Sequence, residues 1–151
     1  MAWEIDPSHS EATFSVKHMM FTTVRGHFNV LSGHLHIDEE HPEDSWVDAQ
    51  VDATSVDTRD EKRDGHLRSP DFFDAEHYPV LTFKSTKVEK AGGNQYKVLG
   101  DLTMHGVTKS AKTKVNRKEW GLNWNAALEG GGVLVSEDVN IEIDLEALNK
   151  A

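Results

Sequence analysis

Apolar and polar residues alternate with a period of two along most of this 151-residue chain. Between residues 12 and 16, Ala12, Phe14 and Val16 fall on one face, and Thr13 and Ser15 fall on the other. A half-buried β-strand has this pattern, because successive side chains point to opposite faces of a sheet. Apolar stripes at helical spacing are nearly absent. The alternation therefore predicts an all-β fold.

The same alternation predicts about seven strands, joined mostly by short turns. The clearest turn is "AGGN" at 91–94, whose residues tolerate the positive φ of a tight hairpin. Near Gly33 the alternation changes phase, which indicates a bulge or a bend. The predicted strands are 10–20, 24–38, 46–57, 80–91, 95–105, 107–117 and 133–145. Consecutive strands joined in this way favour an antiparallel up-and-down barrel or a sandwich.

Length and charge narrow the class of protein. The length of 151 residues fits a single domain over 1–151. With 26 acidic and 16 basic residues, the formal net charge is -10. Binding to phosphate groups requires a basic surface, so we expect no nucleic-acid partner and no anionic membrane surface.

Segments that would target or anchor the chain are not apparent in the sequence. No run approaches the roughly 18 apolar residues of a membrane span, so we expect no membrane insertion. The first ten residues lack the basic and apolar regions of a signal peptide, which favours a cytoplasmic protein. A periplasmic or secreted location is the alternative if a signal peptide has been removed. The chain has no Cys, so neither disulfides nor thiolate metal ligands are available.

The stretch "HLRSPDFFDAEHYP", residues 66–79, breaks the strand pattern with two adjacent aromatic residues and a Pro at each end. Ser69 as a cap and Pro70 at the first helical position predict the start of a short helix. Phe72 and Phe73 would then face apolar surface, and Pro79 would end the segment. Two interpretations stay open: a lid over a cavity, or a plug that closes the core.

The residues predicted to face inward leave two interpretations open for the interior. Ala12, Ala49 and Ala53 are small, and Met104 is adaptable in shape. A small barrel with such residues either encloses an apolar cavity or packs into a filled core.

Histidines and carboxylates suggest metal or catalytic chemistry only weakly. His34, His36 and His41 lie near acidic residues, but the alternation places His34 and His36 on the solvent face, so we expect no metal site. His18 shares a face with Phe14 and could contact either a ligand head group or core backbone. The acidic residues near His77 have no nucleophile or phosphate-loop motif around them. We therefore expect no enzyme activity and no cofactor.

Several segments together resemble the YceI-like family over nearly the whole chain. They include "HLRSPDFFDAEHYP" at 66–79, "HGVTK" at 105–109 and "GLNWNAALEGGGVLV" at 121–135. The resemblance implies a lipocalin-like barrel that binds a polyisoprenoid lipid in an apolar tunnel, with no catalytic site. It also implies that 60–78 is a short helical crossover lying over the barrel.

The resemblance implies a function and a set of contact residues. The expected ligand is a long-chain isoprenoid of the quinone or prenyl diphosphate type, held by a carrier, storage or sequestering protein. The alternative is a stress-related structural or interaction protein with a filled barrel and no ligand. His18 and Arg68 are expected to contact the ligand head group. The residues expected to line the cavity are Phe14, Val16, Met20, Phe28, Phe72, Phe73, Phe83, Leu102 and Trp124.

The chain departs from the family pattern between Lys109 and Asn116. Family members usually carry roughly 30 more residues there, enough for most of two strands. We therefore expect residues 107–117 to form one strand with an open edge, protected by the basic residues Lys109, Lys112, Lys114, Arg117 and Lys118. Such an edge favours a homodimer in which the strand from Val133 to Leu145 pairs across chains, with an open monomer as the alternative.

Overall fold

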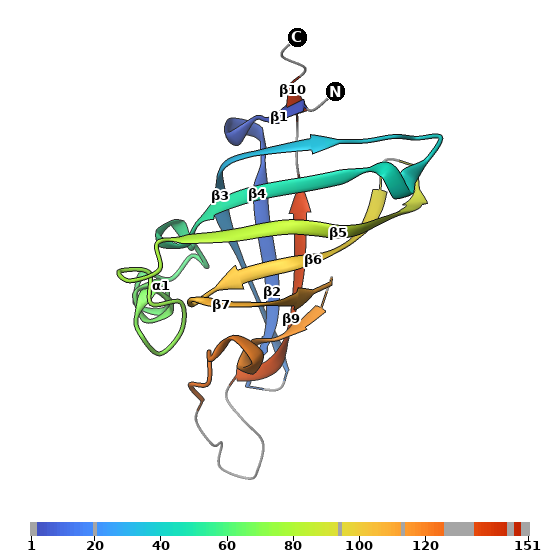
Figure 1. The fold of residues 1–151 in the computed structure, drawn as a ribbon. Helices are drawn as coiled ribbons and strands as arrows, with labels where there is room; N and C mark the ends of the chain where they lie inside the picture. Colours follow the sequence, from blue (N-terminus) through green and yellow to red (C-terminus); the bar gives the residue numbers. More distant parts are fainter. Residues whose placement is uncertain are drawn as a thin grey trace.

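The structure is a computed structural model that describes residues 3–19, 21–93, 95–112, 114–125, 135–144 and 147–148 (Figure 1). The strands are β1 Trp3–Ile5, β2 Glu11–His18, β3 Thr22–His36, β4 Trp46–Asp52, β5 Val80–Gly92, β6 Gln95–Met104, β7 Val107–Ala111, β8 Lys114–Asn116, β9 Val135–Asp144 and β10 Ala147–Leu148. The helix is α1 Glu61–Arg68, and the short 3-10 turns are η1 Pro7–His9, η2 Pro42–Asp44, η3 Ala53–Ser55 and η4 Arg117–Trp120.

The strands form a nearly closed antiparallel barrel, which confirms the predicted fold class. Along the sheet the order is β7-β6-β5-β4-β3-β2-β9-β8. From β2 to β7 each strand therefore lies beside the next one in the sequence, as in an up-and-down barrel. The short strands β1 and β10 pair with each other, and β1 also pairs with β3.

The predicted single strand over 107–117 is wrong. In the structure β7 pairs with β6, where Ala111 faces Gly100, and β8 pairs with β9, where Val115 faces Val139. The segment changes partners between Ala111 and Lys114 because its two halves complete opposite edges of the sheet. Eight strands therefore follow one another around the described barrel, rather than about seven. The seam of the barrel lies between β7 and β8.

The last long strand pairs within its own chain. β9 pairs with β2 over most of its length and with β8 from Asp138 to Asn140. Exchange of this strand between two chains would have to break both sets of pairs, and the homodimer stays a prediction.

The helical crossover is confirmed, but its helix lies earlier than predicted. α1 is capped by Asp60, whose carboxylate accepts the backbone N–H groups of Lys62 and Arg63. Ser69 is the C-cap rather than an N-cap, and Pro70 follows the helix end. An acidic cap and Glu61 in the first turn stabilise the helix N-terminus, whereas Pro after the C-cap cannot continue the helix. After the helix, the backbone folds back through bonds such as Phe73 N–H to Leu67 O.

The hairpin and the phase change that the sequence predicted both appear in the sheet. The hairpin between β5 and β6 is confirmed, and Gly93 in its turn has a positive φ of 55°. The register of β3 against β4 shifts between Val30 and Ser32, which places a bulge two residues before Gly33. The core within this frame contains the inward faces of β3 and β4 together with Phe72 and Phe73 of the crossover.

Candidate ligand-binding site

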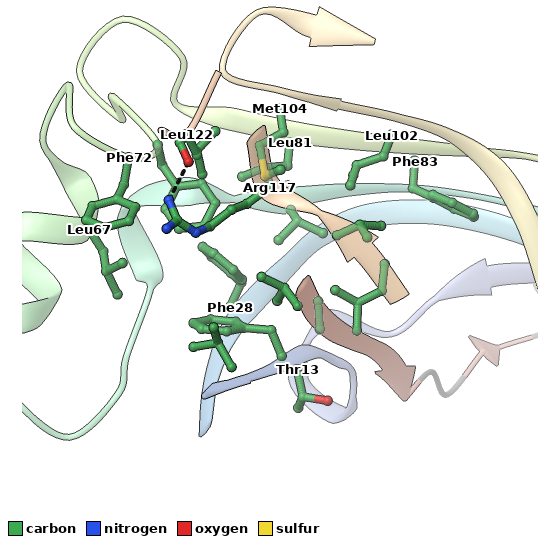
Figure 2. A pocket seen from close by; sticks show the side chains of 18 of the residues that line it. Thr13, Phe28, Leu67, Phe72, Leu81, Phe83, Leu102, Met104, Arg117 and Leu122 are labelled. Carbon is green, nitrogen blue, oxygen red and sulfur yellow. Dashed lines mark hydrogen bonds between the residues drawn. The ribbon is translucent and has the colours of Figure 1, made fainter. Parts of the chain in front are cut away.

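An apolar cavity of about 140 Å³ lies inside the barrel (Figure 2). It is lined by inward-facing residues of the strands, by the crossover and by the segment after β8. In Figure 2, Leu67 and Phe72 lie toward one end of the cavity, and Leu102 and Phe83 toward the other. The lining residues are Ala12, Thr13, Phe14, Val16, Phe28, Val51, Leu67, Phe72, Phe73, Leu81, Thr82, Phe83, Leu102, Met104, Val115, Arg117, Leu122, Val135, Val139, Ile141 and Glu142.

Aromatic rings connect the crossover to the wall of the barrel. The ring centroids of Phe14 and Phe28 lie 5.5 Å apart, and Phe73 meets Phe28 edge-on at 5.2 Å. Such tilted and edge-to-face contacts are favourable for aromatic pairs. Phe72 and Phe73 are buried in the core and line the cavity at the same time. The crossover is therefore part of the cavity wall.

Glycines opposite aromatic residues give the rings room. Phe14 on β2 pairs with Gly26 on β3, and a side chain at Gly26 would collide with the Phe14 ring and with Thr58. Gly100 on β6 lies equally close to the ring of Phe83. Both phenylalanines line the cavity, so these two glycines set where its aromatic wall lies.

Arg117 is the one buried charged side chain among the described residues that line the cavity. Only 4% of its surface is exposed. Its guanidinium donates to the backbone oxygens of Leu122 and Val135, at 2.5 and 3.3 Å, and lies 5.8 Å from the centre of the Phe72 ring. Burial lowers the pKa of Arg117 below its ordinary value, and the nearby charge of Glu137 acts in the opposite direction. The cavity wall is thus almost wholly apolar, and the guanidinium of Arg117 beside it donates to backbone oxygens.

A second aromatic cluster contains His66 and Phe72 of the crossover together with Trp124. The His66 ring lies 5.0 Å from Phe72 and 4.6 Å from Trp124, measured between ring centroids. Its Nε2 lies 2.9 Å from a carboxylate oxygen of Asp71. These contacts join α1 to the segment that follows η4.

The structure brings most of the predicted contact residues to the cavity wall. Those that line it are Phe14, Val16, Phe28, Phe72, Phe73, Phe83 and Leu102. Trp124 packs behind the wall against His66 and Phe72. Met20 and the side chain of His18 lie outside the described residues. Whether the lining residues contact a ligand stays a prediction.

Arg68 takes a different place from the one expected for a head-group contact. Its guanidinium donates to the backbone oxygens of Thr54 and Val56, which anchors α1 to η3 and the residue after it. It is absent from the cavity lining described above.

Sequence reasoning missed Arg117, which it placed on a protected outer edge. That placement is wrong, because the side chain is buried in the barrel. The alternation carried a signal: Val115 and Arg117 are two residues apart, and both are buried and line the cavity. Arg117 was instead counted with the lysines of the segment, because basic residues commonly protect an open strand edge.

A larger polar cleft of about 830 Å³ adjoins the cavity. Thr13, Phe14, Ile141 and Glu142 line both spaces. The cleft also contains exposed or half-buried charged groups, which are Glu11, Arg25, His27, Asp57, Arg59 and Arg63. Phe14 pairs with Ile141 and Thr13 with Glu142, so this part of the β2–β9 wall lies between the apolar cavity and the charged cleft.

One group of side chains has the spacing of metal ligands. Donor atoms of Asp38, His41 and Asp44 lie within 4.8 Å of one another. The Asp38 carboxylate accepts the backbone N–H groups of Glu40 and His41, and the His41 bond chiefly lowers the pKa of Asp38. These bonds explain the cluster as a turn-stabilising arrangement.

In the part of the chain that the structure describes, no helix is long and apolar enough to cross a membrane.

Comparison with known proteins gives consistent sequence matches. The family model described as "YceI-like domain" matches residues 3–147. A UPF0312 protein of Vibrio parahaemolyticus is 46% identical over 102 residues, covering 68% of this chain and 54% of the relative. A UPF0312 protein of Pectobacterium atrosepticum is 35% identical over 142 residues, covering 91% and 73%. The chain thus spans about half the length of the first of these curated relatives.

Solved structures share the fold at low sequence identity. BcnA of Burkholderia cenocepacia superposes with a TM-score of 0.72 at 21% identity, over 93% of this chain and 98% of that one. A protein described as a polyisoprenoid binding domain from Saccharophagus degradans, implicated in plant cell wall breakdown, superposes with a TM-score of 0.69 at 19% identity, over 95% of each chain.

Proposed function

The chain belongs to the YceI-like domain family, and we propose that it binds a long-chain polyisoprenoid inside its barrel and acts as a carrier, storage or sequestering protein. The single observation that supports this most is the apolar cavity with its aromatic wall. A structural neighbour is described as a polyisoprenoid binding domain, which points to the same ligand class. The proposal is a binding function rather than catalysis.

The size of the cavity sets how such a ligand would be held. An engineered apolar cavity of about 150 Å³ binds benzene, so a space of about 140 Å³ accommodates one end of a long ligand rather than its whole length. The rest of the chain would extend beyond the cavity at the end where Figure 2 places Phe83 and Leu102. Burial of each methylene-sized group contributes about 0.8 kcal/mol, offset in part by ordering of the chain.

A filled barrel that acts only as a structural or interaction protein is the competing function. Trp120 supports it in part, since this side chain is fully buried and donates its Nε1–H to Leu102 O. The cavity that remains beside it favours ligand binding.

A cavity-filling substitution tests the proposed function. Ala12 on β2 lines the cavity, so Ala12→Leu places new atoms where the ligand would lie. Overpacking of this kind costs about 1–3 kcal/mol, so we expect affinity for an added polyprenyl quinone to fall about tenfold or more in a fluorescence titration. Ala91→Leu, at an exposed position near the β5–β6 turn, is the matched control and should leave affinity unchanged. Equal affinity in both variants and the parent protein would argue against binding in this cavity.

A further inference from the structure

The polar cleft on the other side of the β2–β9 wall from the cavity contains most of the arginines of the chain. Three of the five arginines in the sequence, Arg25, Arg59 and Arg63, line this cleft of about 830 Å³. The other two, Arg68 and Arg117, donate to backbone oxygens elsewhere in the fold. On a chain with a net charge of -10, such a group of arginines is a local excess of basic side chains. The volume of the cleft is within the range of roughly 300–1,000 Å³ that small-molecule sites have.

Backbone pairing brings Arg25 and Arg59 to the same end of the cleft. His27 on β3 and Asp57 after η3 exchange two backbone hydrogen bonds of 3.0 Å. Arg25 lies two residues before His27, and Arg59 lies two residues after Asp57. Because the two segments run antiparallel, both positions lie on the same side of this bridge. Two guanidiniums of like charge therefore come from neighbouring segments.

These two guanidiniums are available to a ligand. Among the described residues, the side chains of Arg25 and Arg59 have no hydrogen-bond or ion-pair partner, and both are exposed. Arg63 is half-buried and donates from Nε and one terminal nitrogen to the hydroxyl and backbone oxygens of Thr58. Like charges on neighbouring segments are unfavourable, and an anion between them removes that repulsion.

The loop that carries Arg59 is held in place by its own hydrogen bonds. The backbone of Arg59 has a positive φ of 66°, and its N–H donates to the Asp57 carboxylate, which also lies 3.9 Å from Nε2 of His27. The buried Thr58 donates its N–H and its hydroxyl to the Asp64 carboxylate. A left-handed backbone persists in a residue other than Gly only where the surroundings hold it, and such residues cluster at functional sites.

Neutral polar groups and carboxylates lie at different distances along the cleft. Arg25 on β3 pairs with Ser15 on β2, and Ser15 pairs in turn with Asn140 on β9, so a hydroxyl and an amide share the row of Arg25. Glu142 lies two residues further along β9, and Glu11 lies four residues before Ser15 on β2. Two residues of a strand span about 7 Å. The charge of the cleft therefore changes from basic to acidic along the strands.

We propose that this cleft binds a small hydroxylated molecule through a terminal phosphate monoester, as in a sugar phosphate. The phosphate would lie between Arg25 and Arg59, since guanidinium N–H forks match phosphate oxygens and two positive charges match a group that carries about -1.5 to -2 at pH 7. The hydroxyl groups would extend toward Ser15, Asn140 and the Glu142 carboxylate. Because the β2–β9 wall separates the cleft from the apolar cavity, this inference goes beyond isoprenoid binding and does not depend on it.

Four probes test the parts of the proposed ligand separately. They are glucose 6-phosphate, inorganic phosphate, glucuronate and glucose, each titrated into the parent protein at low ionic strength and followed by calorimetry. Glucose 6-phosphate should bind about tenfold or more tighter than glucuronate and glucose, because only the phosphate matches both guanidiniums. It should also bind about threefold or more tighter than inorganic phosphate, as expected for additional hydrogen bonds from the sugar.

Substitutions then assign the binding to the cleft. Arg25→Gln and Arg59→Asn each remove one guanidinium, and Asn tolerates the positive φ at position 59. Each should weaken binding of glucose 6-phosphate about tenfold. Lys90→Gln removes the same charge from an exposed position on β5 outside the cleft and should leave the affinity unchanged. Thermal unfolding checks that all three variants fold.

Each alternative result contradicts the proposal. If glucose 6-phosphate does not bind, or if glucuronate or glucose binds as tightly, the cleft is not a phosphate site. If inorganic phosphate binds as tightly as glucose 6-phosphate, the hydroxylated part of the ligand is refuted. An equal loss of affinity in Lys90→Gln and in the two arginine variants would attribute binding to the overall charge rather than to this cleft.

Discussion

Glycine opposite phenylalanine is the residue-scale feature that shapes this barrel. Gly26 on β3 faces Phe14 on β2, and a β-carbon at Gly26 would approach both the Phe14 ring and Thr58 too closely. Phe14 lines the cavity and also lies at its border with the cleft. The absence of one side chain therefore positions a ring that belongs to the candidate site.

Gly26→Ala should destabilise the protein. The Phe14 ring or Thr58 must move, and overpacking of this kind costs about 1–3 kcal/mol. Gly65 is the matched control, because it lies in α1 and a β-carbon there would meet nothing within 4 Å. Gly65→Ala should stabilise the protein by about 1 kcal/mol, since Ala is the better helix former. Chemical denaturation measures both, and a loss of stability in both variants, or in neither, would contradict this account.

Single residues also show how far the sequence could predict the site. Phe14, Val16 and Phe83 were predicted correctly to face inward because strand alternation alone assigns their face. The positions of Arg68 and Arg117 were not predicted, since composition cannot tell a guanidinium that binds backbone oxygens outside the cavity from one buried beside it. Their positions depend on how α1 and η4 pack, which is a tertiary property.

At the scale of elements, the last turn of the crossover contains a hydrogen bond between His77 and Asp74, two side chains whose charge depends on pH. After α1 the chain turns at Asp74, which has a positive φ of 48°, and its backbone oxygen accepts the N–H groups of His77 and Tyr78. Nδ1 of His77 lies 2.9 Å from the Asp74 carboxylate. This hydrogen bond is the main reason that the pKa of His77 is raised above its ordinary value, with smaller contributions from the charges of Asp74 and Glu76.

His77 should therefore stabilise the turn at Asp74 more strongly below pH 6.5 than above it. A raised folded-state pKa means that the contribution of His77 is fully present below its ordinary pKa of 6.5 and is lost as pH rises through the folded value. Asp74→Asn should lower the pKa of His77 in an NMR titration, and Asn tolerates the positive φ at this position. Glu76→Gln, which removes only a charge acting through space, should lower it less. A pKa of His77 that is the same in Asp74→Asn as in the parent protein would show that the pair does not form.

Element types were easier to predict than element ends. The hairpin at 91–94 was predicted correctly because its glycines carry the turn chemistry in the sequence itself. The helix start was wrong because Ser69 and Pro70 match a start signal locally, whereas Asp60 makes the cap in the structure. The break between β7 and β8 was missed because it depends on which sheet edge each half completes, and strand alternation does not encode that choice.

At the scale of the whole molecule, the chain closes a barrel around an apolar space and leaves a seam. Among the described strands, β7 pairs only with β6 and β8 only with β9. Lys109 and Lys112 along this segment are exposed, and lysines on an open edge oppose pairing with other chains. With a net charge of -10, the outer surface also repels further copies and polyanions. The proposed ligand would bind in the apolar interior.

The central claim is that this interior holds an isoprenoid, and native mass spectrometry of freshly purified protein, combined with lipid extraction, tests it most directly. The account predicts a second species heavier than the 16.9 kDa chain by the mass of one lipid, and recovery of that lipid in the extract. Ala12→Leu should reduce the fraction of the heavier species. Detection of the unliganded mass alone, both as purified and after addition of a polyprenol or a polyprenyl quinone, would contradict the claim.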